Sequence, residues 1–264
     1  MASRKEQKEA ARQARLEEER RRAEQAARNR RYQTLGGLLV VVVAIIVVVF
    51  VVSSSSGSTG LQPKKQATAT VKSIESLIGG IQQSGRTLGN PNAPVTMTYF
   101  GDLECPICRD FTLTTFPQLV ANEVKAGKVK VVYKSFCTAT CNGPGEGVFK
   151  TQQAAAYAAG EQNKFWDYAE LFYHEQGTED TGYVTTSYLD TLAEQTPGLD
   201  LAQWQSAKGS SSLVSDVIND ENAGTAAGVT GTPTLVFKGP KGSVSPTAGV
   251  PSYAELQQDI AQVS

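Results

Sequence analysis

The chain has 264 residues, of which 40% are hydrophobic and 19% charged, and its formal net charge is −1. This apolar content excludes wholesale disorder, and the balanced charge gives no indication of a nucleic-acid partner. The average conceals an asymmetry, because residues 1–34 carry 11 Lys or Arg and 6 Asp or Glu, whereas the rest carries 14 and 20. All four cysteines fall between Cys105 and Cys141, which indicates a local site instead of a disulfide-stapled scaffold.

An uncharged apolar run at 35–52 separates the two parts of the chain. As a helix, its 18 residues would be about 27 Å long, close to the ~30 Å of bilayer hydrocarbon. A basic flank at 28–32 precedes it and no charge follows before Lys64, so the positive-inside rule places the N-terminus in the cytoplasm. The sequence predicts a charged cytoplasmic tail (1–34), a single-pass signal-anchor helix in the cell membrane (35–52) and an extracytoplasmic remainder. A cleaved signal peptide is the alternative, although no A-x-A site follows the run.

The segment after the run begins with a predicted flexible linker at 53–70, rich in Ser, Gly and Thr. Apolar residues at helical spacing predict a helix at 71–83. β-branched and aromatic runs predict strands at 95–100 and 128–136, with a helix at 105–124 between them. Such a helical crossover favours parallel pairing of the two strands.

A helix-rich region follows, and the chain then returns to β-structure. The predicted helices cover residues 148–176, 187–195, 201–207 and 213–227. Strands at 234–237 and near Val244 and a helix at 252–263 complete the chain. This order predicts an α/β core with a helical insert at about 146–227.

The sequence Cys105-Pro106-Ile107-Cys108 follows a predicted strand and opens a predicted helix. Two intervening residues at a helix start bring the sulfurs close enough to form a disulfide. The free N–H groups and the dipole of the helix N-terminus stabilise a thiolate, which is the species that attacks or leaves in disulfide exchange. The motif alone also occurs in zinc sites and inert bridges.

Two distant segments carry a resemblance to a known family. Residues 89–111 read GNPNAPVTMTYFGDLECPICRDF, and residues 229–234 read VTGTPT. Between them, residues 154–172 read AAAYAAGEQNKFWDYAELF. Residues 71–264 resemble the DsbA-like branch of the thioredoxin superfamily, in which such motifs occur in this order. The resemblance implies a thioredoxin fold with an inserted helical subdomain.

The resemblance also implies roles for individual residues. Cys105 would be the nucleophile that forms the mixed disulfide, and Cys108 the more buried resolving thiol. Thr232 and Pro233 would dock the substrate next to a cis peptide bond. The variable pair of the motif, Pro106 and Ile107, departs from the strongest oxidants of the family, which have His at the second position.

Asp102 and Glu104 flank the motif. One of them is a possible proton acceptor for Cys108, although two exposed loop carboxylates explain the sequence equally well. A carboxylate close to the sulfurs would raise the pKa of the thiolate.

A second pair, Cys137 and Cys141, begins where the second predicted strand ends. Three interpretations remain open: a local structural disulfide, which is favoured, a second redox pair, or a four-thiolate zinc site. The favoured interpretation leaves the protein without a metal. The sole histidine, His174, lies in the predicted insert and is interpreted as a helix-surface residue.

The function predicted from these observations is extracytoplasmic thiol–disulfide oxidoreductase, an oxidase that introduces disulfides into exported proteins with reduced cysteines. The resemblance implies reoxidation by a membrane redox partner of the DsbB or VKOR type. We expect a monomer without a cofactor or a nucleic-acid partner. The alternatives are a reductase or isomerase supplied by a membrane electron carrier, and a tethered peptide-binding or chaperone module with structural disulfides only.

Overall fold

A computed structural model describes residues 64–141 and 146–264. The predicted cytoplasmic tail, the predicted membrane helix at 35–52 and the linker up to residue 63 lie outside the described residues. Within the two described ranges, no helix combines the length and the apolar character needed to cross a membrane.

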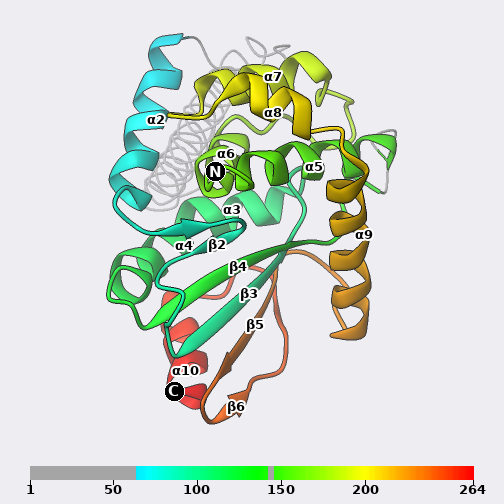
Figure 1. The fold of residues 1–264 in the computed structure, drawn as a ribbon. Helices are drawn as coiled ribbons and strands as arrows, with labels where there is room; N and C mark the ends of the chain where they lie inside the picture. Colours follow the sequence, from blue (N-terminus) through cyan, green and yellow to red (C-terminus); the bar gives the residue numbers. More distant parts are fainter. Residues whose placement is uncertain (1–63, 142–145) are drawn as a thin grey trace, which may run out of the picture. The chain divides into compact units, whose positions relative to one another are not determined.

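A seven-stranded mixed sheet forms the centre of the fold (Figure 1). The strands run in the order β1-β2-β4-β3-β5-β6, and β7 pairs with β5. The central strand β3 (Val95–Gly101) pairs in parallel with β4 (Val129–Ser135), as the helical crossover predicts, and antiparallel with β5 (Thr234–Gly239). The remaining strands are short: β1 (Gln83–Ser84), β2 (Thr87–Leu88), β6 (Gly242–Ser243) and β7 (Thr247–Ala248).

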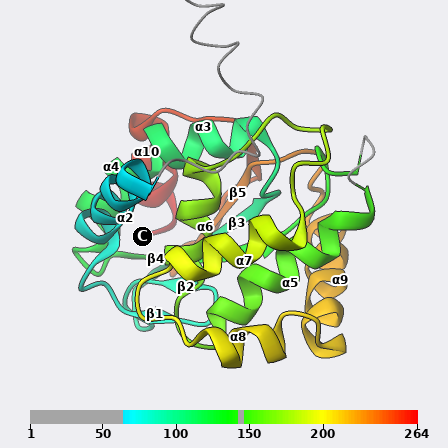
Figure 2. The same cartoon turned by 90° about the horizontal axis from the view of Figure 1, so that it is seen from above.

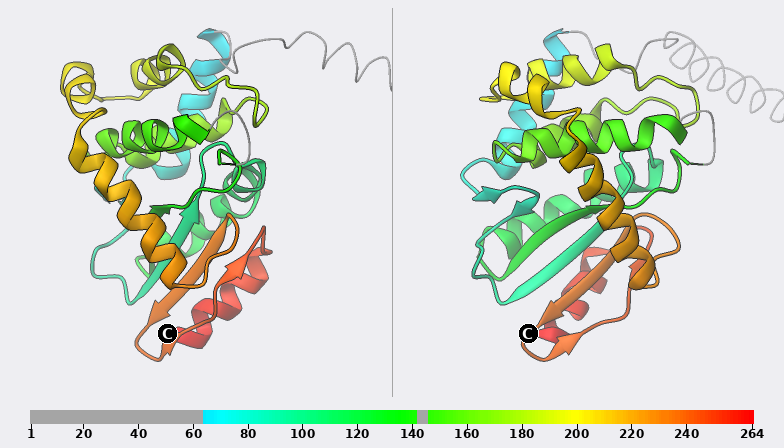
Figure 3. Two further views of the ribbon diagram at one scale, coloured as in Figure 1. Left: turned by 90° about the vertical axis from the view of Figure 1, so that its right-hand side faces the viewer. Right: turned by 45° about the vertical axis from the view of Figure 1, so that its right-hand side comes forward.

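Helices cover both faces of this sheet. Helix α9 (Ser211–Ala226) packs against β4 on one face, and α10 (Tyr253–Val263) packs against β5 on the other (Figure 3). Burial alternates along β4, because successive side chains point to opposite faces: Val129, Val131 and Tyr133 are fully buried while the residues between them are partly exposed, so one face is covered completely and the other only in part.

The helical insert lies between β4 and β5 in the sequence. It comprises a 3₁₀ turn (Glu146–Val148) and the helices α5 (Phe149–Gly160), α6 (Phe165–His174), α7 (Thr186–Gln195), α8 (Leu201–Ala207) and α9. Helices α5 to α8 form a layer above the sheet in Figure 1 and are seen from above in Figure 2. Side-chain caps fix three helix starts, because Thr185, Asp200 and Ser210 each accept a hydrogen bond from a backbone N–H of the first turn.

The first described helix differs from its prediction at both ends. Helix α2 (Lys64–Ile78) begins inside the predicted linker and ends before Gly79 and Gly80, which break it. Gly80 has a φ of 76°, a conformation that glycine adopts without strain. Residues 79–83 are therefore not helical, and the hairpin of β1 and β2 that follows was not predicted.

The predicted helix at 105–124 is divided into three parts. Helix α3 (Pro106–Thr114) is followed by α4 (Phe116–Leu119) and a π-helical turn (Val120–Val124). The break at Thr115 has a local cause, because Pro117 has no N–H to donate to the carbonyl of Leu113.

The predicted helix at 148–176 is likewise divided, into α5 and α6. Asn163 adopts a φ of 59° between them, a left-handed conformation that asparagine tolerates better than most residues. The reversal folds α6 back against α5, and the pair packs as a helical hairpin.

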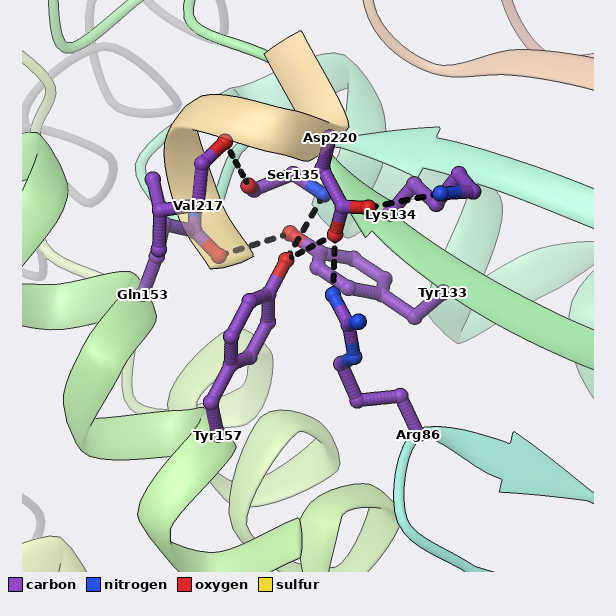
Figure 4. Close-up of polar contacts among 8 residues, drawn as sticks. All are labelled: Arg86, Tyr133, Lys134, Ser135, Gln153, Tyr157, Val217 and Asp220. Atoms are coloured by element: carbon purple, nitrogen blue, oxygen red, sulfur yellow. Dashed lines mark hydrogen bonds and ion pairs between the residues drawn. The ribbon is translucent and has the colours of Figure 1, made fainter. Parts of the chain in front are cut away.

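A charged cluster around the buried Asp220 fixes α9 to the sheet (Figure 4). The carboxylate of Asp220 accepts hydrogen bonds from Arg86, from Lys134 Nζ at 2.6 Å and from the Tyr157 hydroxyl at 2.6 Å. The Tyr157 oxygen in turn accepts from the backbone N–H of Ser135 at 3.0 Å. This cluster anchors the helix immediately before residues 227–233, the loop that leads into β5.

Candidate active site

Cys105 and Cys108 lie where β3 gives way to α3. Cys105 is the residue before the helix, and Pro106 is the first helical residue. A proline fits there because the first N–H of a helix has no intrahelical acceptor. Both cysteines are free thiols, and their exposed fractions are 5% for Cys105 and 0% for Cys108. Cys105 is therefore the sulfur nearer to solvent, and Cys108 faces the core.

The surroundings of Cys105 favour its thiolate. A hydrogen bond from the Cys108 thiol makes the largest contribution to a lowering of the pKa of Cys105 to about 7. The Thr232 side chain and the backbone N–H groups of Cys108 and Ile107 lower it further, against the opposing effect of burial. These N–H groups are available because the first turn of a helix leaves them without intrahelical acceptors.

Cys108 has the opposite tendency. Complete burial raises the pKa of Cys108 well above its usual value, and the neighbouring Cys105 raises it further. The Tyr99 hydroxyl, from β3, donates to the backbone carbonyl of Cys108 at 3.4 Å and so connects the first turn of α3 to the sheet. The two thiols are thus differentiated, and Cys105 loses its proton first.

The loop before β5 faces this pair. Antiparallel register sets Thr234 opposite Phe100 at the end of β3, which brings Thr232 and Pro233 to the sheet edge that carries Cys105. The Thr232–Pro233 peptide bond is cis. The Cys105 thiol donates to the carbonyl oxygen of Thr232 at 3.3 Å. The structure therefore brings together the two motifs that lie far apart in the sequence.

A groove of about 640 Å³ opens beside the Cys105 sulfur. The start of α3 and three loops line it, and the lining residues include Cys105, Ile107, Thr138, Cys141, Glu179 and Gly231. Ile107 is 47% exposed and presents an apolar side chain at the position where a histidine could donate to the thiolate. The groove therefore lies directly beside the sulfur of Cys105.

Cys137 and Cys141 form a disulfide in the loop that follows β4, with their Cα atoms 5.8 Å apart. Because β4 runs parallel to β3, this loop lies at the same sheet edge as Cys105, and both of its cysteines line the groove. The bond engages two of the four sulfurs that a four-thiolate zinc site would need.

Asp102 is directed toward this second loop. Its buried carboxylate accepts hydrogen bonds from the backbone N–H groups of Thr138 and Thr140, both at 3.0 Å, and from the Thr140 hydroxyl at 2.5 Å. Burial raises the pKa of Asp102, and these hydrogen bonds oppose the increase. In the described part of the chain, no hydrogen bond joins this carboxylate to either thiol.

Glu104 is also buried, with an exposed fraction of 2%. Burial, followed by the charge of Asp102, raises its pKa to about 7, and a hydrogen bond with Thr140 lowers it. Its Oε2 has no hydrogen-bond partner among the described residues. Neither carboxyl is an exposed loop group, and the contacts of both lead to the loop 137–141.

Several residues that position the site carry no local sequence signal. Gln176, after α6, donates to the backbone carbonyls of Leu103 at 2.7 Å and Cys105 at 3.2 Å. The Tyr173 hydroxyl donates to the carbonyl of Asp102 at 3.4 Å. These contacts come from the helical insert, about 70 residues away along the chain, and only the tertiary fold brings them to the cysteines.

His174 does not belong to this groove. It is half-buried at the end of α6 and lines a separate pocket with Thr112 and Glu170. Burial, followed by the charge of Arg109, lowers its pKa.

A free CxxC pair at a helix N-terminus, with one stabilised thiolate, one buried thiol and a facing cis-proline loop, defines a thiol–disulfide oxidoreductase with a thioredoxin fold. This class excludes a binding module in which all cysteines are structural. The family model described as thioredoxin matches residues 82–254, and the chain belongs to this family, in its DsbA-like branch.

Relatives and solved structures agree with this assignment. The chain is 28% identical over 172 residues to the probable disulfide bond formation protein D of Bacillus anthracis, covering 64% of this chain and 75% of that protein. The disulfide bond formation protein D of Bacillus subtilis is 28% identical over 153 residues, with coverages of 56% and 65%.

The solved structures show the same fold. Oxidised BdbD of Bacillus subtilis aligns with a TM-score of 0.58 at 23% identity, covering 69% of this chain and 95% of that one. Wolbachia pipientis alpha-DsbA1 aligns with a TM-score of 0.56 at 16% identity, with coverages of 72% and 95%.

Proposed function

We propose that this oxidoreductase acts as an oxidase and introduces disulfides into exported proteins through Cys105 and Cys108. The observation that carries the proposal is the stabilised Cys105 thiolate beside a buried Cys108 thiol. Stabilisation of the reduced form makes a CxxC pair a better oxidant. The names of the Bacillus relatives, disulfide bond formation protein D, support this direction.

The proposed reaction has two exchange steps. A substrate thiolate attacks Cys105 Sγ of the oxidised pair, which forms a mixed disulfide and breaks the Cys105–Cys108 bond. Cys108 leaves as a thiolate and takes up a proton, since burial raises its pKa. A second substrate thiolate then attacks the substrate sulfur of the mixed disulfide and releases the Cys105 thiolate. Two substrate thiols become one disulfide, and the enzyme pair gains two electrons.

We assign the remaining roles in the same reaction. Thr232 and Pro233 dock the substrate chain next to Cys105, while Pro106 and Ile107 form the rim of the site. The disulfide of Cys137 and Cys141 has a structural role. A membrane redox partner of the DsbB or VKOR type reoxidises the reduced pair, and the uncharged run at 35–52 anchors the enzyme with its catalytic domain outside the cytoplasm.

The central test uses the full chain in detergent and a reduced, unfolded secreted protein as substrate. Cys105→Ser removes the attacked sulfur, so the rate of disulfide formation should fall by at least about a thousandfold. The matched control, Cys137→Ser with Cys141→Ser, should keep more than about a tenth of the rate, because the reactive pair is intact. Full activity of Cys105→Ser would refute the assignment.

The stabilisation of the Cys105 thiolate supports the oxidase, but its size favours the second candidate, a reductase or isomerase. The Cys105 pKa of about 7 is close to that given for thioredoxin, whereas DsbA is near 3.5. The reduction potential of the Cys105–Cys108 pair separates the two candidates. We expect a value closer to about −120 mV than to about −270 mV, and a potential near the second figure would favour the reductase.

A further inference from the structure

A pair of threonine hydroxyls connects the two cysteine-bearing loops. Thr138 lies between Cys137 and Cys141, and its hydroxyl is hydrogen-bonded to the hydroxyl of Thr232. Both threonines are half-buried and line the groove beside Cys105. The Thr232 carbonyl also accepts from the Cys105 thiol. Thr138 therefore contacts the residue, Thr232, that itself contacts the Cys105 sulfur.

The backbone around Thr138 is fixed from two sides. The disulfide closes the loop at both ends, and Asp102 Oδ2 accepts from the N–H groups of Thr138 and Thr140 at 3.0 Å. The N–H of Thr138 is thus already engaged. Its hydroxyl is the group with which it contacts Thr232.

The direction of this hydrogen bond decides what Thr232 does. A hydroxyl has one proton to donate and two lone pairs to accept with. If Thr138 donates, the Thr232 proton is free to point toward the Cys105 sulfur, whose pKa the Thr232 side chain lowers. If Thr138 accepts, the same proton is drawn away from the sulfur.

We propose that Thr138 is a positioning residue: its hydroxyl donates to Thr232 and thereby directs the Thr232 proton to the Cys105 thiolate. Each hydrogen bond in such a chain polarises the next and strengthens it. The disulfide and Asp102 hold the loop so that this orientation is maintained. The proposal rests on the proposed function only in taking Cys105 as the reactive thiol.

The other titratable groups around Cys105 are distinct from this pair. Cys108 belongs to α3, Asp102 and Glu104 belong to the loop before it, and Glu179 lines the groove from the loop after α6. A substitution at position 138 that removes only the hydroxyl leaves all four in the protein.

The test measures the pKa of Cys105 in the full chain. Iodoacetamide labelling of Cys105 is followed against pH, with mass spectrometry of the Cys105 peptide and of the Cys137–Cys141 disulfide. Thr138→Val retains shape but has no hydroxyl. The Thr232 hydroxyl then loses the bond that orients it, so the measured pKa should rise by roughly 0.2 to 0.5, a fraction of the effect of one modest hydrogen bond. Thr138→Ser restores the hydroxyl and should return the pKa to the parent value.

Thr114→Val is the matched control. It makes the same substitution at the far end of α3, where the hydroxyl donates only to the carbonyl of Asp110, and should leave the pKa unchanged. An unchanged pKa in Thr138→Val overturns the proposal, and a lowered pKa shows that Thr138 accepts instead of donating. Neither result affects the assignment of the reactive pair, which depends on the loss of turnover in Cys105→Ser.

Discussion

The two cysteine pairs follow neighbouring parallel strands and line the same groove, but the backbone N–H groups around them bind different partners. After β3, the N–H groups at the start of α3 face the sulfur of Cys105. After β4, the N–H groups of Thr138 and Thr140 are engaged by the carboxylate of Asp102. One set of N–H groups stabilises a thiolate, and the other fixes a loop.

This difference explains how one sheet edge holds a pair of free thiols beside a disulfide. The rate of thiol–disulfide exchange depends on the stability of the thiolate, which hydrogen-bond donors increase and burial decreases. Cys105 has donors, and Cys108 is buried without exposure. Cys137 and Cys141 are joined across a short loop, and both line the groove.

The largest expected effect concerns the two free thiols. At pH 7 about half of Cys105 is thiolate, since its pKa is lowered to about 7, whereas burial keeps Cys108 protonated. Iodoacetamide should therefore modify Cys105 more than about a hundredfold faster than Cys108. The Cys105 rate should rise as the pH increases through 7 and level off above it, as mass spectrometry of each peptide at several pH values would show. Equal rates at the two cysteines would remove the distinction between them.

The next largest effect is expected from a substitution that breaks the hydrogen bonds between Asp102 and the loop 137–141. Asp102→Asn keeps one acceptor oxygen but cannot serve both N–H groups and the Thr140 hydroxyl. With at least one buried donor left unpaired, the free energy of unfolding should fall by about 2–4 kcal/mol in urea titrations.

Asp180→Asn is a suitable control for this substitution. Asp180 is exposed and has a φ of 61°, which asparagine also tolerates, so the free energy of unfolding should change by less than about 0.5 kcal/mol. If Asp102→Asn were as stable as its control, the carboxylate would not be what fixes the loop 137–141.

Much of the sheet edge follows from local sequence. The β-branched run before Cys105 and the proline after it predict a strand and a helix start, and the crossover predicts the parallel neighbour that carries Cys137. The positions at which helices break are harder to predict from the sequence, because they depend on single residues. Pro117 ends α3 early, and Asn163 divides a stretch whose composition is helical throughout.

The partners of the site residues could not be predicted in the same way. Asp102 and Glu104 stand next to Cys105 in sequence, yet their contacts lead to Thr140. Gln176 reaches the carbonyl of Cys105 only because α6 folds over the sheet. A side chain one to three residues from a motif has several directions open to it, and tertiary packing selects one.

The smallest expected effect is the change in the free energy of unfolding when each of the two disulfides is opened. Opening the Cys137–Cys141 bond frees a loop of five residues, which should lower the free energy of unfolding by about 2 kcal/mol on the chain-entropy relation. Opening the Cys105–Cys108 bond of an oxidase should instead raise it, because the reduced pair is stabilised in the native state. Cys105→Ala with Cys108→Ala isolates the first bond, and Cys137→Ala with Cys141→Ala isolates the second.

Urea unfolding of each double variant, oxidised and then reduced, measures the two changes separately. Opposite signs are expected because native contacts to the Cys105 thiolate exist only after reduction, whereas loop closure is lost whenever Cys137 and Cys141 separate. A loss of stability on reduction in each of the two double variants would mean that the Cys105–Cys108 disulfide acts as a brace, and the oxidase direction would then be wrong even with a reactive Cys105. A higher free energy of unfolding after reduction of Cys105–Cys108 alone would show that the native protein stabilises the reduced pair, which is what makes the pair oxidising.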